Sequence, residues 1–340
     1  MAEPLGDAIK ALALGRSLSA EQTTDAFRVI MEGNATPAQI AALLIGLRVK
    51  GESAEEVAGA AQALRNAMRR VDAPSPETLV DTCGTGGGTL ATFNVSTMAA
   101  LVAAGAGVRI AKHGNRSFTT KCGSADVLEA LGVGIDLAPE RAARALADAG
   151  IVFMFAPAMH PAMRHAIPVR KELGIPTVMN LIGPLANPAG ALRQVVGVAD
   201  PNRMPLIAGA LQRLGAIHAL VVHGHPGIDE ISPLGPTTII EVREGASREW
   251  TLDPATYGLF TADPSELAGG TPAENAVLIE SLLAGQGPAG ARNGVLLNAA
   301  AAIYVAGVAP DIRAAVDVAR QSLAEGRARE ALDRLRAATA

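Results

Sequence analysis

Aromatic side chains are scarce in this chain of 340 residues, which contains one Trp, two Tyr and six Phe. Proteins that bind single-stranded nucleic acid stack bases on such rings, and proteins that bind a duplex present a basic surface. The formal net charge here is −4, so the sequence offers neither feature. We therefore expect no nucleic-acid partner.

Cysteine is almost absent as well, since Cys83 and Cys122 are the only two. Two thiols are too few for a four-thiolate metal site, and we expect both to be reduced and buried. No apolar run reaches the roughly 18 residues of a membrane helix, because Arg109 and Asn298 interrupt the longest candidates. The first residues do not resemble a secretory signal. We expect a cytoplasmic protein with no membrane partner.

The first 72 residues show helical signals only. Ser19 and Ser53 each begin a capping box, and Thr36 precedes a proline suited to the first position of a helix. The apolar residues that follow at helical spacing are Ile40, Leu43, Leu44, Leu47, Val57, Ala60, Ala61, Leu64 and Met68. Residues 1–72 thus predict a small all-helical domain, which a proline-containing linker closes.

Beyond residue 77, short apolar segments alternate with helical ones. We expect strands near residues 79–80, 108–111, 151–155, 194–198 and 217–222, and an edge hairpin at 238–242 and 248–252. We expect helices at 139–149, 205–214, 273–283, 294–306 and 311–338. This pattern predicts an α/β fold with a mostly parallel central sheet, formed by residues 77–162 and 191–340. Residues 163–190 interrupt the alternation, and we expect them to join the helical domain in space.

A glycine-rich loop at residues 81–88 is the first part of the candidate functional site. It follows a predicted strand and leads to Thr92, Asn94, Ser96 and Thr97, where a helix is expected to begin. Backbone amides of a glycine loop and of a helix N-terminus lack partners and attract phosphate groups. The loop matches neither a Walker motif nor a dinucleotide fingerprint. We interpret it as an anion cradle.

A second polar segment, residues 112–117, comes directly after the next predicted strand. Parallel strands end at one edge of a sheet, so this segment is expected to face the same crevice. Lys112 supplies a point charge for phosphate, and Asn115 supplies directional hydrogen bonds. His113 either contacts the ligand or only orders the loop.

Two further groups of charged residues complete the candidate site. Asp229 and Glu230 follow the strand at 217–222, and adjacent hard oxygen ligands on a loop suit Mg²⁺ bound to a diphosphate. Arg164 and Arg170 offer guanidinium groups that suit a carboxylate substrate.

Together these motifs, with Gly123–Gly132 and Asn180–Pro188, resemble the anthranilate phosphoribosyltransferase family of tryptophan biosynthesis over nearly the whole chain. The resemblance implies transfer of the phosphoribosyl group of 5-phosphoribosyl 1-diphosphate (PRPP) to the amine of anthranilate, with Mg²⁺ as cofactor. It also implies a homodimer formed through the helical domain.

By position, the resemblance assigns roles to individual residues. PRPP-binding positions are Gly84, Gly87, Gly88, Thr92, Asn94, Val95, Ser96, Thr97, Lys112, His113, Gly114, Asn115, Arg116, Ser117, Phe118, Thr119, Thr120 and Ser124. Gly84, Asn115 and Arg170 would contact anthranilate, and the metal positions are Ser96, Asp229 and Glu230. Lys112, Asn115 and Arg170 are the expected catalytic residues.

The chain departs from the family pattern in two places. The family's loop usually reads Gly-Thr-Gly-Gly-Asp-Gly, whereas Gly88 and Thr89 stand at its last two positions here. A carboxylate is therefore missing, and we expect altered Mg²⁺ dependence. At residues 175–180, Pro176 and Met179 replace a more usual Arg and an aromatic, which concerns details of the substrate tunnel.

Two alternatives remain open from the sequence. A pyrimidine nucleoside phosphorylase would share the broad architecture, although its own signature segments are not evident. A non-catalytic nucleic-acid-binding relative of the fold would need the basic groove that this composition disfavours.

Overall fold

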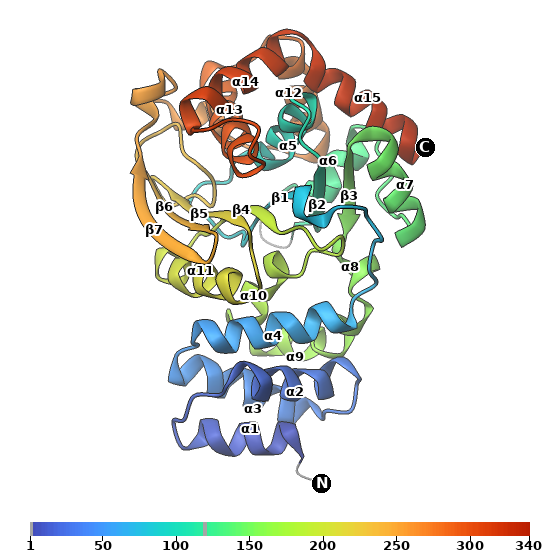
Figure 1. Cartoon of the computed structure of the whole chain (residues 1–340), viewed down its shortest axis with the longest axis vertical. Coiled ribbons are helices and arrows are strands. Elements are labelled where there is room, and N and C mark those ends of the chain that lie inside the picture. Colours follow the sequence, from blue (N-terminus) through green and yellow to red (C-terminus); the bar gives the residue numbers. More distant parts are fainter. Residues whose placement is uncertain (1–2, 118–120) are drawn as a thin grey trace.

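The computed structural model describes residues 3–117 and 121–340. Phe118, Thr119 and Thr120, which belong to the predicted PRPP site, lie outside the described residues. The molecule is built in tiers (Figure 1): the N-terminal helices lie at one end, the C-terminal helices at the other, and a sheet lies between them. The predicted fold class, a small helical part with a large α/β part, is confirmed.

The N-terminal tier consists of α1 (Pro4–Ala13), α2 (Ala20–Met31), α3 (Pro37–Lys50) and α4 (Ala54–Ala67). The predicted starts are confirmed, since Ser19, Thr36 and Ser53 each form a capping box with the residue three positions on. The predicted apolar faces of α3 and α4 are buried, except that Met68 is half-buried just past the end of α4.

The segment from residue 161 to 186 packs on this tier. It contains η2 (Pro161–His165), α9 (Ile167–Leu173), α10 (Met179–Ile182) and η3 (Gly183–Leu185). Helix η2 contacts α2, α9 contacts α3, and α10 contacts α4. The buried side chains of this segment, such as Val169 and Ile182, share one hydrophobic cluster with those of α1–α4.

The sheet has seven strands in the order β3-β2-β1-β4-β5-β6-β7. Its parallel strands are β1 (Val80–Gly84), β2 (Ile110–Gly114), β3 (Ile151–Phe155), β4 (Arg193–Gly197) and β5 (His218–Gly224). The predicted hairpin is confirmed as the antiparallel β6 (Thr237–Arg243) and β7 (Ala246–Leu252) at one edge. Strand order reverses between β1 and β4, and open α/β sheets bind their ligands at the carboxyl ends beside such a reversal.

Helices cover both faces of the sheet. The other α-helices of the described residues are α5 (Val95–Gly105), α6 (Ser124–Ala130), α7 (Pro139–Ala149), α8 (Ala156–Met159), α11 (Met204–Arg213), α12 (Pro272–Leu283), α13 (Ala289–Val305), α14 (Ile312–Ala324) and α15 (Arg327–Thr339). Neighbouring residues of β4 point to opposite faces: Val195 joins the cluster with α5 and α13, and Val196 joins the cluster with α11 and α1–α4. No helix among the described residues is long and apolar enough to cross a membrane.

Several predicted boundaries were wrong. Strand β1 extends to Gly84, so the first half of the predicted glycine loop lies within the strand, and α13 begins at Ala289 and not at residue 294. The helix expected at residues 311–338 is two helices, because Gly326 adopts a left-handed φ of 76° between α14 and α15. Only glycine enters that conformation at little cost, so it ends one helix and turns the chain. Strand β2 extends to Gly114, so Lys112 and His113 lie within the strand and not after it. Their side chains therefore point to opposite faces of the sheet.

Candidate active site

The site lies where β1 and β4 end side by side. Gly84 and Gly197 are paired at the last position of these strands, and the loop carrying Asp229 crosses directly over them. A Cβ on Gly197 would lie 1.6 Å from the carbonyl oxygen of Asp229, and one on Gly84 would lie 2.5 Å from its Oδ2. Position 197 therefore requires glycine, whereas a side chain at position 84 would displace the Asp229 carboxylate. The sequence analysis did not single out Gly197, although its place at the end of an apolar strand matches that of Gly84.

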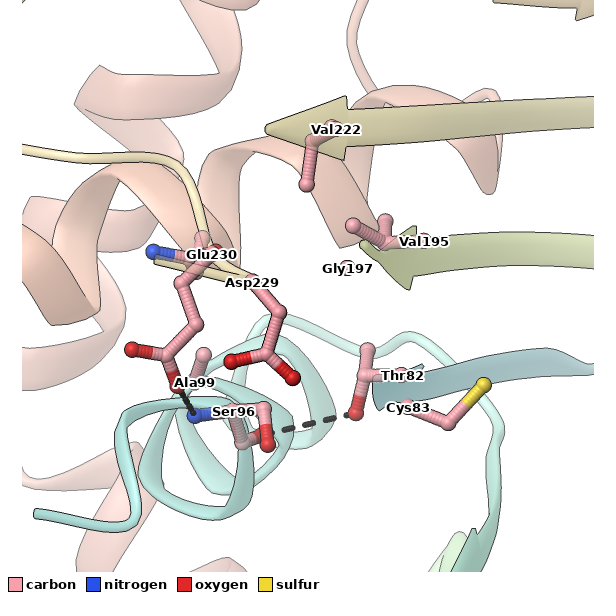
Figure 2. Close-up of a pocket in the computed structure, with 10 residues that line it drawn as sticks. Thr82, Cys83, Ser96, Ala99, Val195, Gly197, Val222, Asp229 and Glu230 are labelled. Carbon is pink, nitrogen blue, oxygen red and sulfur yellow. Dashed lines mark hydrogen bonds between the residues drawn. The ribbon is translucent and has the colours of Figure 1, made fainter. Parts of the chain in front are cut away.

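Both carboxyl groups of the Asp229–Glu230 pair accept hydrogen bonds from the predicted anion cradle. The amide of Gly86 donates to Asp229 Oδ2 at 2.8 Å. The amide of Ser96 donates to Glu230 Oε1 at 3.3 Å (Figure 2). The hydroxyl of Thr92 donates to Glu230 Oε2 at 3.0 Å. The glycine loop and the first turn of α5 thus donate amide hydrogen bonds to carboxyl oxygens in this structure, as expected of an anion cradle.

The carboxyl groups of Asp229 and Glu230 are buried next to each other. Burial and the neighbouring Asp229 raise the pKa of Glu230 to about 8. Burial also raises the pKa of Asp229. The site therefore disfavours two unneutralised carboxylates in a region of low dielectric, and a bound cation would favour their charged forms.

Lys112 lies beneath the cradle. Its side chain is buried, and Nζ donates to the carbonyl oxygen of Thr82 and approaches Ser96 Oγ at 3.4 Å. Burial lowers the pKa of Lys112, while the charge of Asp81 opposes that shift. Its side-chain nitrogen therefore lies beside β1 and the first turn of α5.

His113 points to the other face of the sheet. Its Nε2 lies 3.1 Å from Nε2 of His160, and both rings are buried. Its backbone amide donates to Asp81 Oδ1 at 3.0 Å, and Asp81 Oδ2 accepts from Asn187 Nδ2 at 2.8 Å. The His113 ring is therefore directed toward the loop at residues 183–187, away from the cradle amides. Burial raises the pKa of Asp81 to about 6.

The residues at the start of α5 have distinct partners. Asn94 Oδ1 accepts from Asn275 Nδ2 at 2.9 Å, which fixes its amide toward α12. Val95 is buried, so only its backbone can face a ligand. Thr97 is buried, and its hydroxyl makes no hydrogen bond within the described part of the chain.

The segment after β2 is tied to the start of α6. Ser124 Oγ donates to the carbonyl oxygen of Asn115 at 3.2 Å, and the amide of Ser117 donates to Asp126 Oδ2 at 3.2 Å. Arg116 is exposed and forms ion pairs with Asp126, at 2.8 Å, and with Glu129. Those ion pairs direct its guanidinium toward α6, and Gly114 closes the strand beside Ser124.

Two positions of the glycine loop differ in their surroundings. Gly87 has a left-handed φ of 85°, and a Cβ there would meet no atom within 4 Å. A Cβ on Gly88 would lie 3.1 Å from the carbonyl oxygen of Gly227 and 3.6 Å from the amide nitrogen of Asp229. The position at which the family usually has Asp therefore faces the carboxylate loop.

Arg164 and Arg170 lie apart from the cradle, in the helical tier. Arg170 is on α9, half-buried, and Arg164 is exposed on η2. Burial lowers the pKa of Arg170. Among the described residues no hydrogen bond or ion pair joins either guanidinium to the glycine loop. The structure thus brings together Gly84, Ser96, Lys112, Asp229 and Glu230, and leaves the two arginines on a separate tier.

Two family models match this chain. Residues 76–329 match the a/b domain of a glycosyl transferase family, and residues 6–68 match its helical bundle domain. The fold and the site therefore define an α/β glycosyl transferase with an N-terminal helical bundle.

Relatives narrow this class. The anthranilate phosphoribosyltransferase of Rubrobacter xylanophilus is 51% identical over 330 residues, which cover 97% of this chain and 96% of that protein. The solved enzyme of that name from Thermus thermophilus has a TM-score of 0.92 and 44% identity, and the match covers 98% of this chain and 99% of that one. The Saccharomyces cerevisiae enzyme, solved with PRPP and Mg, has a TM-score of 0.87 and 30% identity, with 98% and 97% covered. The chain belongs to the anthranilate phosphoribosyltransferase family.

Proposed function

We propose that this protein transfers the phosphoribosyl group of PRPP to the amine of anthranilate, releasing diphosphate, as a step of L-tryptophan biosynthesis. The observation that carries the proposal is the cradle itself, in which the amides of Gly86 and Ser96 hold two carboxylate oxygens. Amides in this arrangement suit the oxygens of a diphosphate. Relatives solved with PRPP and Mg and with 4-fluoroanthranilate support the choice of substrates.

The residues of the site fit a magnesium ion. Asp229 and Glu230 provide adjacent hard oxygens, and Ser96 Oγ lies next to them. No group of three or more His, Cys, Asp and Glu gathers into a metal site within the described residues. Such a donor set suits an ion that takes its other ligands from diphosphate and water. When bound, the ion would neutralise charge on the departing diphosphate.

The reaction makes limited demands on the chain's own groups. The bond from C1 to the diphosphate oxygen breaks with its electron pair on diphosphate, and the amine lone pair forms the new bond to C1 and then loses a proton to water. Lys112 and the cradle amides stabilise the charge that develops on the leaving group. The aromatic amine of anthranilate is neutral near pH 7, so no strong general base is required.

The remaining assignments are part of the same proposal. Asn115 and Gly84 would contact anthranilate, and Arg170 would bind its carboxylate once the helical tier approaches the sheet. We take residues 1–72, joined by about 163–190, as the helical domain, and 77–162 with 191–340 as the α/β domain. The homodimer through the helical domain and the cytoplasmic location stay predictions from the sequence.

Anthranilate fluorescence provides the test. We expect its loss on incubation with PRPP, with a rate that depends on added Mg²⁺. The Arg170→Ala variant should raise the KM for anthranilate much more than the KM for PRPP, and equal effects would indicate a general defect. Turnover of a pyrimidine nucleoside with phosphate, and none of PRPP with anthranilate, would show that the proposal is wrong.

A further inference from the structure

One asparagine of the C-terminal helices lies among apolar residues and is not explained by the reaction. Asn298 is in the middle of α13, a helix whose neighbouring positions are Ala, Leu and Val, and it is only 5% exposed. Burying a carboxamide costs free energy unless its donors and acceptor are paired. The partners of this side chain therefore indicate why it is there.

Those partners belong to one residue of the carboxylate loop. Asn298 Oδ1 accepts from the amide of Ile231 at 2.9 Å, and Nδ2 donates to the carbonyl oxygen of Ile231 at 2.8 Å. Nδ2 also donates to the carbonyl oxygen of Gly294, one turn earlier in α13, at 2.8 Å. The carboxamide thus pairs with both the amide and the carbonyl of Ile231, as the backbone of a neighbouring β-strand does. Ile231 directly follows Glu230 in the sequence.

Helix α13 also packs along α5, whose first turn supplies the Ser96 amide that binds Glu230. Asn298 lines the same cavity as Ser96, Asp229 and Glu230. A single helix, α13, therefore contacts both the carboxylate loop and α5. A leucine at position 298 would fill similar space and would leave the amide and carbonyl of Ile231 without these partners.

We infer that Asn298 is a positioning residue that holds the Asp229–Glu230 pair against the start of α5, in the geometry that binds the magnesium–diphosphate group. This inference rests on the proposed function. Asn298 acts through the backbone of Ile231 and needs no contact with substrate. Partners that orient metal ligands in this way typically change metal affinity 10- to 100-fold when they are removed.

Mg²⁺ binding to the full-length protein, measured by calorimetry with saturating pyrophosphate, is the direct test. We expect Asn298→Leu to raise the Kd for Mg²⁺ by about tenfold or more. Tyr304→Phe is the matched control: it is on the same helix and loses one buried hydrogen bond, from the Tyr304 hydroxyl to Glu241 at 2.9 Å. This control should change the Kd by less than about twofold, because Glu241 lies on β6, away from the carboxylate loop.

Hydrogen exchange of the wild-type protein gives a second measurement that does not depend on the variant folding. The Ile231 amide should exchange slowly without ligand and stay protected when Mg²⁺ and pyrophosphate bind. Fast exchange of this amide in the free protein would overturn the inference, as would an equal loss of Mg²⁺ affinity in both variants or none in Asn298→Leu. If the wild-type protein binds no Mg²⁺ with pyrophosphate, the proposed function fails instead.

Discussion

Acidification to pH 5 should destabilise this protein through the buried His113–His160 pair. Burial lowers the pKa of His160 to about 4 from its usual 6.5. Burial and the facing ring of His160 lower the pKa of His113 well below its usual value. Because the folded state disfavours the protonated rings, this stability is fully present above pH 6.5 and is lost as the pH falls from 6.5 toward 4. For His160 alone the loss at pH 5 is about 2 kcal/mol.

The measurement compares urea unfolding at pH 7.5 and at pH 5 for the wild type and for His160→Gln. Glutamine can still pair with His113 Nε2 but takes up no proton. The free energy of unfolding should therefore fall by about 2 kcal/mol less in the variant than in the wild type. The control is His225→Gln, which removes an exposed histidine. It measures how far the loss of any one histidine changes the pH dependence of the free energy of unfolding.

The refuting result is a loss of stability at pH 5 that is equal in the wild type and in His160→Gln. Such a result would show that His160 titrates alike in the folded and unfolded chains. It would mean that the His160 ring does not stay in the buried environment that lowers its pKa here.

Three further predictions concern single positions. Gly88→Asp should shift the Mg²⁺ concentration that gives the maximal rate, because its carboxylate would stand beside the amide of Asp229; an unchanged Mg²⁺ profile would show that the missing carboxylate has no role. Gly326→Ala should lower the free energy of unfolding in urea by about 1 kcal/mol, since φ there is 76°, and an unchanged midpoint would contradict this. Glu241→Gln should lower the free energy of unfolding in urea by about 3 kcal/mol, because the buried carboxylate accepts hydrogen bonds from His218, Arg248, Trp250 and Tyr304. An unchanged free energy of unfolding would show that the glutamine side chain replaces these bonds.

Much of the fold could be predicted from local sequence patterns. The capping boxes at Ser19, Thr36 and Ser53 depend on residues three positions apart, so they can be recognised without tertiary contacts. The order of strands and helices follows from alternating apolar segments, and it indicated a parallel sheet with an edge hairpin. The break at Gly326 was missed because a glycine within an apolar helical pattern is compatible with either a continuous helix or a turn.

Some residues of the site could likewise be predicted from the sequence, and others could not. The glycine loop, Lys112 and the Asp229–Glu230 pair could be identified because each follows a predicted strand, and parallel strands end at one edge. The requirement for glycine at position 197 could not, because it arises from a loop more than 30 residues later that crosses the strand end. The direction of the His113 side chain depended on where β2 ends, and helical or strand boundaries are weakly encoded locally.

The sequence by itself therefore determined the kinds of chemical group available and the edge of the sheet at which they meet, because these depend on spacing along the chain. Only the tertiary structure decided which groups touch. It placed the carboxylates of Asp229 and Glu230 on the amides of Gly86 and Ser96, and it placed Asn298 on the backbone of Ile231. Contacts of this kind join residues that lie from 67 to 143 positions apart, and no local pattern specifies them.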